Sequence, residues 1–140
     1  MKNSVLGVLL VALPALAHSA PLDSALSCGD SPHHFFSELR AHHLIEASPM
    51  HVEPNSVNAF WPAHDVRLTA FDHDVFAVFG YQRGDLLFRP GDGSPSDKPL
   101  YGVVVVAGEE SVRKSLKAAG SKASVEHAAP FLTAIVCEGA

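Results

Sequence analysis

The stretch FDHDVF, residues 71–76, places a histidine between two aspartates, and both residue types hold metal ions or transfer protons. It lies between two segments with strand-like patterning, and aspartate is common in turns because its carboxylate accepts hydrogen bonds from nearby backbone N–H groups. In extended chain Asp72 and Asp74 point to one side and His73 to the other. We therefore predict a polar turn here and not a metal or acid–base site.

Two pairs of adjacent histidines, 33–34 and 42–43, suggest a second chemistry, because imidazole nitrogens bind zinc and copper and carboxylates can complete the ligand set. No H-E-x-x-H or C-x-x-C spacing accompanies them. On a helix, residues four apart share one stripe, whereas residues nine apart lie on opposite faces. The alternative hypothesis is a Zn or Cu site on this segment, built from Glu38, His42, Glu46 and His33. His43 continues the apolar stripe of this segment, and we expect it to be half-buried.

The only tryptophan, Trp61, lies in the segment NAFWPAHD, residues 58–65. Tryptophan is enriched in binding hot spots, although core packing is its commoner role. A second segment, PGDGSPSDKP at 90–99, has the composition of an exposed loop. We predict that a partner-binding surface, if it lies on loops, uses these two segments, with the candidates Phe60, Trp61, His64, Asp92 and Asp97.

Catalytic and nucleotide-binding motifs are missing from the sequence. It has no G-x-S-x-G, and the strand–glycine–helix segment VVVVAGEESVRK lacks the glycine pattern of a phosphate-binding loop. Glu109 and Glu110 would also repel an anion at the start of that helix. We expect no enzymatic activity and no cofactor. A serine, a histidine and an aspartate brought together only by folding remain an open alternative.

The N-terminus has the three parts of a secretory signal peptide. Lys2 precedes a nine-residue apolar run at 5–13, which is too short to span a membrane, and Ala15 and Ala17 form a small-x-small cleavage signal. We predict a signal peptide at 1–17, with cleavage after residue 20 as the alternative. The remaining chain, 18–140, has the length of one domain, which we expect to be periplasmic or secreted without a stable membrane anchor.

Cys28 and Cys137 are the only cysteines. An even number of cysteines in an exported protein predicts a disulfide, here between the N- and C-terminal segments. It would close a loop of about 109 residues, for which chain entropy gives a stabilisation of ~4–5 kcal/mol. Neither cysteine is then available as a nucleophile.

The elements that must position these residues follow from periodicity and from helix start and stop signals. Ser31 and Pro32 begin a helix that extends to residue 47, and a second helix with acidic residues in its first turn occupies 109–119. We expect a short strand with a loop over 50–65, and strands at 66–71, 75–81, 86–89, 100–107, 123–127 and 131–137, of which 75–81 is buried on both faces. The order predicts an α+β domain with an antiparallel sheet of five to six strands and two helices.

The composition is that of a globular protein, with 47% hydrophobic and 18% charged residues. Loss of Lys2 with the signal changes the formal charge from −5 to −6, so a nucleic acid is not an expected partner. A small, exported, single-disulfide α+β domain is similar in class to bacterial periplasmic inhibitor, immunity or accessory proteins, which work by binding. We expect a non-enzymatic protein that binds another protein in the periplasm or outside the cell.

Overall fold

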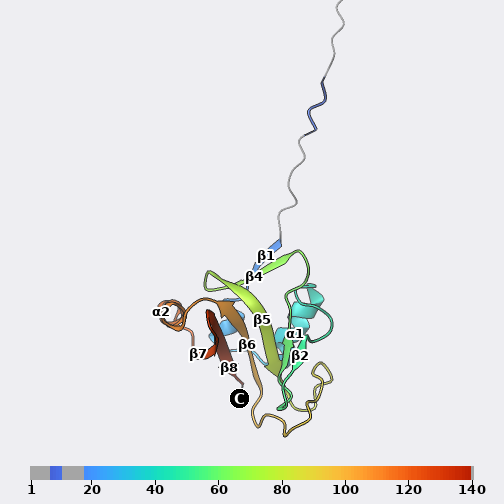
Figure 1. Cartoon of the computed structure of the whole chain (residues 1–140), viewed down its shortest axis with the longest axis vertical. Coiled ribbons are helices and arrows are strands. Elements are labelled where there is room, and N and C mark those ends of the chain that lie inside the picture. Colours follow the sequence, from blue (N-terminus) through green and yellow to red (C-terminus); the bar gives the residue numbers. More distant parts are fainter. Residues whose placement is uncertain (1–6, 11–17, 140) are drawn as a thin grey trace, which may run out of the picture.

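The computed structural model describes residues 7–10 and 18–139, so the predicted signal peptide, apart from residues 7–10, lies outside the described residues (Figure 1). Within that part of the chain, no helix has both the length and the apolar character that a bilayer crossing requires. The described elements, in chain order, are β1 (His18–Pro21), η1 (Ala25–Ser27), α1 (Pro32–Ala41), β2 (His51–Val52), β3 (Asn58–Phe60), β4 (Val66–Ala70), β5 (His73–Tyr81), β6 (Leu100–Val106), α2 (Glu109–Ala119), β7 (Ser124–Ala129) and β8 (Leu132–Glu138).

The strands form one sheet in the order β1-β4-β5-β6-β8-β7, and β3 also pairs with β5 and carries β2 at its outer side. All pairs are antiparallel except β1 with β4. The predicted α+β fold is confirmed, but the described residues hold eight strands instead of five to six. The missed strand β1 has four residues and no alternating pattern, and it pairs only with a neighbour distant in sequence.

The predicted strand at 86–89 is wrong, because this segment forms a turn. Asp85 organises it: its side chain accepts a hydrogen bond from the Leu87 N–H at 2.9 Å, and its carbonyl accepts one from the Phe88 N–H at 3.2 Å. Phe88 is buried against the ring of Phe36, with centroids 5.1 Å apart. Of the apolar residues that suggested a strand, Phe88 therefore anchors the loop to the core, whereas Leu86 is fully exposed.

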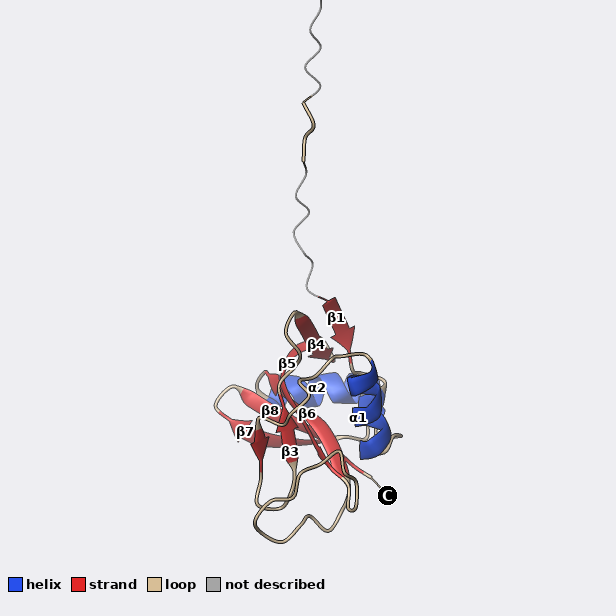
Figure 2. Ribbon diagram, turned by 90° about the vertical axis from the view of Figure 1, so that its right-hand side faces the viewer, coloured by secondary structure: helices blue, strands red, loops and turns tan. Residues whose placement is uncertain are grey.

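Both α-helices lie on the same side of the sheet, and the other side carries none (Figure 2). The core fills the space between the helices and the sheet, and its members come from α1, α2 and alternate positions of the strands. The largest side chains with no exposed surface are Tyr101, Phe36, Phe60, Leu26, Leu68 and Ile135.

Helix α1 begins as predicted, because the Ser31 side chain accepts a hydrogen bond from the His34 N–H at 3.1 Å and Pro32 occupies the first turn. It ends at Ala41, six residues earlier than predicted. His43 has φ +53°, and the Leu44 N–H donates to the Leu39 carbonyl, which is the hydrogen-bond pattern of a Schellman motif. His43 is consequently exposed, and the expectation that it is half-buried is wrong.

Helix α2 and the disulfide match their predictions. Glu109 lies in the first turn of α2, and Gly120 ends the helix at φ +67°, where a side chain would be strained. The disulfide joins Cys28 to Cys137, with 5.1 Å between their Cα atoms. It fastens the segment between η1 and α1 to the last strand.

The segment FDHDVF contains the predicted turn. Phe71 and Asp72 have φ of +49° and +67°, as a two-residue type I′ hairpin between β4 and β5 requires. The polar side chains separate: His73 Nε2 lies 3.1 Å from the Ser115 hydroxyl of α2, and Asp74 accepts a hydrogen bond from Arg67 at 2.8 Å. They form no common site.

A buried amide fastens the long loop between β5 and β6 to the sheet. The Asn58 side chain has no exposed surface; its Nδ2 donates to the Ser56 carbonyl at 2.9 Å and to the Arg89 carbonyl at 2.8 Å. Its Oδ1 accepts from the Arg89 N–H at 2.9 Å. All of the polar atoms of this side chain are therefore used to hold Arg89 and the residues around it.

We expect Asn58→Ala to lower the free energy of unfolding by about 1–3 kcal/mol, because it leaves buried backbone groups without partners. Cleavage by a protease in the 82–99 loop should become faster. Asn55→Ala is the matched control, since Asn55 is exposed and makes one local hydrogen bond, to the Val57 N–H. Urea unfolding and limited proteolysis of the three proteins test this, and equal stability of the two variants would contradict it.

Candidate functional site

The face of the sheet without helices is apolar over most of its area. Strand register places paired residues on the same face, so this side carries Ala59, Phe79, Gly102 and Val136 in one row and Ala77, Val104 and Ala134 in the next. Val106 and Leu132 continue it. Of the strand residues on this face, His51, Ser124 and Glu126 at its edges are polar, and so are Arg67, Thr69 and Asp74 on β4 and the start of β5. We call this surface the open sheet face.

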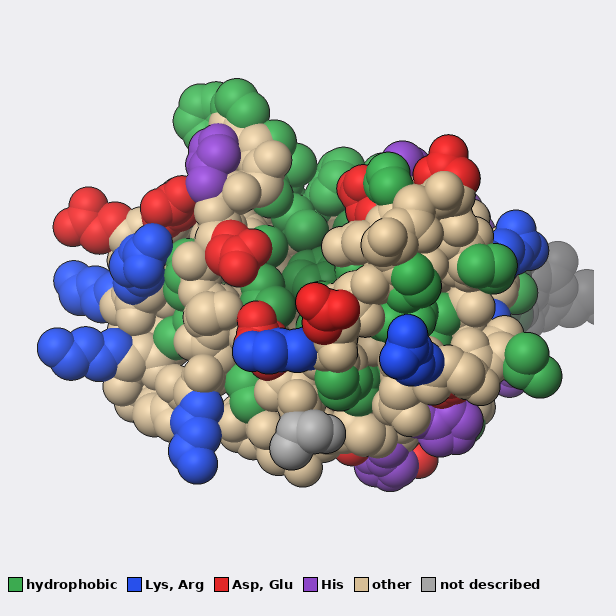
Figure 3. Space-filling model, turned by 90° about the horizontal axis from the view of Figure 1, so that it is seen from below, with side chains coloured by type: hydrophobic (Ala, Val, Ile, Leu, Met, Phe, Trp, Pro, Cys, Tyr) green, Lys and Arg blue, Asp and Glu red, His purple; other side chains and the backbone are tan. Residues whose placement is uncertain are grey.

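The middle of the open sheet face has small residues. Ala77, Gly102 and Ala134 lie there on three neighbouring strands, Val104 stands between the two alanines, and all three small residues are buried. A Cβ atom at Gly102 would collide with the Ile135 carbonyl oxygen and with the ring of Phe79, so a glycine is required for this close approach. Figure 3 shows hydrophobic side chains lining a hollow of the surface with charged side chains on its rims.

An aromatic pair borders the open sheet face. The rings of Trp61 and Phe76 meet edge to face with centroids 5.0 Å apart, and the two residues are 43% and 39% exposed. Phe131, in the turn between β7 and β8, is 84% exposed. The prediction that 75–81 is buried on both faces is therefore wrong, because Phe76 lies at a bulge in β5 and faces solvent.

Of the predicted partner-binding residues, Trp61 is exposed on this face, whereas Phe60 is not accessible. Phe60 has no exposed surface, and its ring lies 5.2 Å from that of Phe36 on the helix side. Alternation along β3 explains the difference, since neighbouring residues of a strand point to opposite faces. The assignment of Phe60 to a binding surface is corrected accordingly.

The other three predicted residues are exposed; His64 lies at the same end of β3 as Trp61, whereas Asp92 and Asp97 lie at the other end. His64 follows β3, next to Asp65. Asp92 and Asp97 lie in the 90–99 loop, which packs against the turn before β3 through hydrogen bonds from the Gly93 N–H to the Pro54 carbonyl and from the Ser96 N–H to the Asn55 carbonyl. The two predicted loops therefore lie at opposite ends of β3.

The residues of the alternative metal site are also separated. Glu46 lies beyond the end of α1, so the stripe of Glu38, His42 and Glu46 does not exist as predicted. His33 turns away to Asp85, with His33 Nδ1 2.6 Å from the carboxylate. Only Glu38 and His42 come together, at 3.5 Å. In the described part of the chain, no three histidine, cysteine or acidic side chains converge as metal ligands.

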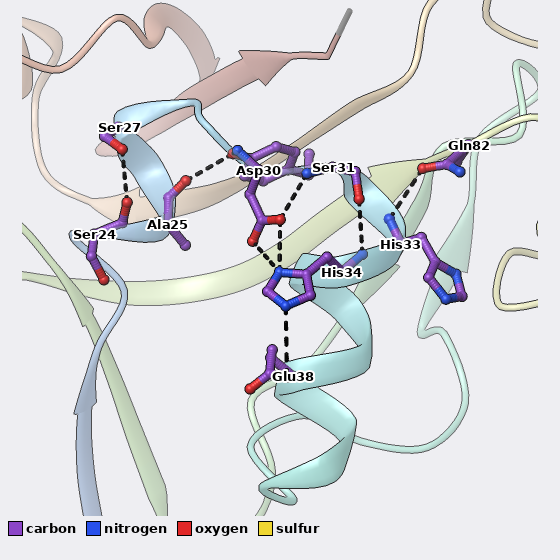
Figure 4. A network of polar contacts seen from close by, with 10 residues as sticks. Ser24, Ala25, Ser27, Asp30, Ser31, His33, His34, Glu38 and Gln82 are labelled. Carbon is purple, nitrogen blue, oxygen red and sulfur yellow. Dashed lines mark hydrogen bonds and ion pairs between the residues drawn. The ribbon is translucent and has the colours of Figure 1, made fainter.

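A second site, which the sequence did not reveal, lies on the helix side of the molecule. The side chain of His34, in the first turn of α1, lies between the carboxylates of Asp30 and Glu38 (Figure 4). Its Nδ1 is 2.7 and 2.9 Å from the two oxygens of Asp30, and its Nε2 is 3.8 Å from Glu38. The hydrogen bond to Asp30 and the charge of that carboxylate raise the pKa of His34 above its ordinary value, and Glu38 adds a smaller effect in the same direction.

These residues border a cleft of about 550 Å³ between the η1 segment and α1. The sequence pattern that could have predicted this site is the spacing of four residues from Asp30 through His34 and Glu38 to His42. Asp30 lies before the helix start, however, so helical periodicity alone does not include it. The cleft depends on how the η1 segment folds back over α1, which Tyr101 fixes by donating a hydrogen bond to the Ala25 carbonyl at 2.8 Å and accepting one from the Asp30 N–H at 3.2 Å.

Comparison with known proteins gave no relative: no protein-family model, no curated protein and no solved structure matches this chain.

Proposed function

We propose that this chain is an exported, non-enzymatic protein that binds another protein through the open sheet face, in the manner of an inhibitor or immunity-type protein. The observation that carries the proposal is the exposed aromatic pair, Trp61 and Phe76, beside an apolar hollow. Export is supported by the signal-like N-terminus and by the disulfide between Cys28 and Cys137, since such bonds persist in oxidising compartments.

Exposure of this apolar face to water is unfavourable in free energy unless a partner covers it. Burial of apolar surface contributes roughly 25 cal/mol per Å², and soluble monomers rarely leave a large contiguous apolar patch in water. Aromatic side chains are enriched at the centres of protein interfaces. The half-buried side chains of Phe79 and Val104, which lie over the small residues in the middle of this face, would contact side chains that project from the partner.

A face-specific cross-linking experiment tests the proposal. A photo-reactive phenylalanine analogue is placed at Trp61 or Phe131, and as a control at Leu86, which is fully exposed in the loop between β5 and β6. In the native host we expect one and the same partner protein to be cross-linked from Trp61 and Phe131 and not from Leu86. Equal adducts at all three sites, no adduct, or an adduct of the chain with itself would each contradict the proposal.

Trp61→Ala should weaken binding of the partner so identified by at least about 30-fold, which corresponds to roughly 2 kcal/mol and is typical of a central aromatic residue. Leu86→Ala should leave the affinity unchanged. Calorimetry with each purified protein measures both, and circular dichroism shows that each remains folded. Equal affinities of the two variants for the partner would show that the aromatic pair is not part of the interface.

A further inference from the structure

The cleft between the η1 segment and α1 joins an apolar floor to an acidic rim. Leu22, Phe35, Leu39 and Leu44 are among its lining residues, together with Ala25. The charged or titratable residues of the lining are Asp30, His34, Glu38 and His42, so neither lysine nor arginine borders it. A volume of about 550 Å³ is within the range of sites for small organic molecules.

The rim presents hydrogen-bond acceptors to an incoming group. With Asp30 accepting the proton on Nδ1 of His34, the Nε2 atom of neutral His34 carries a lone pair. That atom lies 3.8 Å from one oxygen of Glu38, too far for a direct hydrogen bond. The other oxygen of Glu38 lies 3.5 Å from His42 Nε2. A donor with several N–H groups, placed beside Glu38, can bond to the carboxylate and to His34 at once.

We propose that this cleft binds a small amphipathic amine, with its ammonium group between His34 and Glu38 and its hydrocarbon part over the apolar floor. A primary ammonium supplies three donors and one positive charge, which complements the negative rim. Glu38 and Asp30 would repel an anionic ligand, and a purely apolar ligand would gain nothing from their charges. The site lies on the helix side of the sheet and is independent of the open sheet face.

Binding must depend on pH, because the ammonium competes with the proton on His34. The groups facing His34 are Asp30 and Glu38, with His42 on the far side of Glu38, and the η1 side of the cleft adds uncharged residues only. Protonated His34 repels the positively charged ligand. It also competes with the ammonium group for the negative charge of Glu38. Affinity should therefore fall as the pH drops below the raised pKa of His34, by up to about tenfold per pH unit for one competing proton.

The test uses 2-phenylethylamine as the probe, with 2-phenylethanol and phenylacetate as neutral and anionic analogues of similar size. Titrations of the oxidised protein, produced from the full chain, are followed by amide chemical shifts in NMR spectra at pH 8 and pH 5.5. At pH 8 we expect the amine to bind at least about tenfold more tightly than either analogue and to shift the amide resonances of the residues that line the cleft. The affinity for the amine should be lower at pH 5.5.

Variants separate the ammonium site from general apolar binding. Glu38→Gln should reduce amine affinity by about tenfold or more, since it removes the charge without changing the size of the side chain. Glu110→Gln, an exposed carboxylate on α2, is the matched control and should have no effect. Equal binding of the amine and the alcohol, shifts that map elsewhere, or wild-type affinity in Glu38→Gln would overturn the proposal.

Discussion

Replacing both cysteines by alanine is expected to lower the free energy of unfolding by about 4–5 kcal/mol, the chain-entropy value for a bond that closes a loop of this length. Cys28 and Cys137 are separated by 109 positions, so the bond restricts most of the unfolded chain. The loss is a large part of the stability of an ordinary domain, which is about 5–15 kcal/mol. Urea unfolding followed by circular dichroism measures it.

The double variant avoids a free thiol, and the reduced wild-type protein is its control. Both should unfold at the same lower urea concentration if loss of the cross-link is the cause. Cys137 is almost fully buried, so a variant less stable than the reduced protein would reveal an additional packing effect of the substitution. A loss below about 1 kcal/mol in both would show that the bond contributes little to stability.

Phe36→Ala should lower the free energy of unfolding by about 3–5 kcal/mol, the usual result of removing a buried aromatic ring. Phe36 has no exposed surface, and it joins α1 to β3 and to the loop that follows β5. Its ring contacts those of Phe35, Phe60 and Phe88, with centroids 5.1–5.5 Å apart. It also fills the space above Gly80, where a Cβ atom would collide with it.

The matched control for this substitution is Phe36→Leu, which keeps most of the apolar volume and should lose less stability than Phe36→Ala. Thermal and urea unfolding of the two variants give the comparison. Similar, small losses in both would mean that α1 is held to the sheet by other contacts, such as those of Leu39. A large loss in Phe36→Ala alone identifies the ring as the link between helix and sheet.

Local patterns predicted the elements whose stability is mainly local. Helix α2 has acidic residues in its first turn and a glycine after its last, and its bounds follow from them. The apolar run of β6 predicts a strand for a similar reason. By contrast, β1 depends on a partner far along the chain, and α1 ends at Ala41, with His43 in the left-handed conformation where glycine is the usual residue. No single-sequence pattern contains that information.

For the candidate sites too, local sequence predicted some residues, whereas others depended on contacts between distant parts of the chain. Trp61 stood out by its residue type, but the assignment of Phe60 to the surface failed because the register of β3 decides which of two neighbours is buried. The open sheet face required the sheet order, since Ala77, Gly102 and Ala134 come onto one face of neighbouring strands only through pairing. The cleft beside His34 required the fold of the η1 segment over α1.

The bond between Cys28 and Cys137 makes nearly the whole domain a covalent ring. A single peptide-bond cut anywhere between these residues opens the ring but releases no fragment. A protease that cuts within the exposed 90–99 loop would leave β1 to β5 on one piece and β6 to β8 on the other, joined both by the disulfide and by the pairing of β5 with β6. Such a nicked molecule would run as one species on a gel without reductant and as two with it, and it would persist as a two-chain protein with both of its surfaces intact.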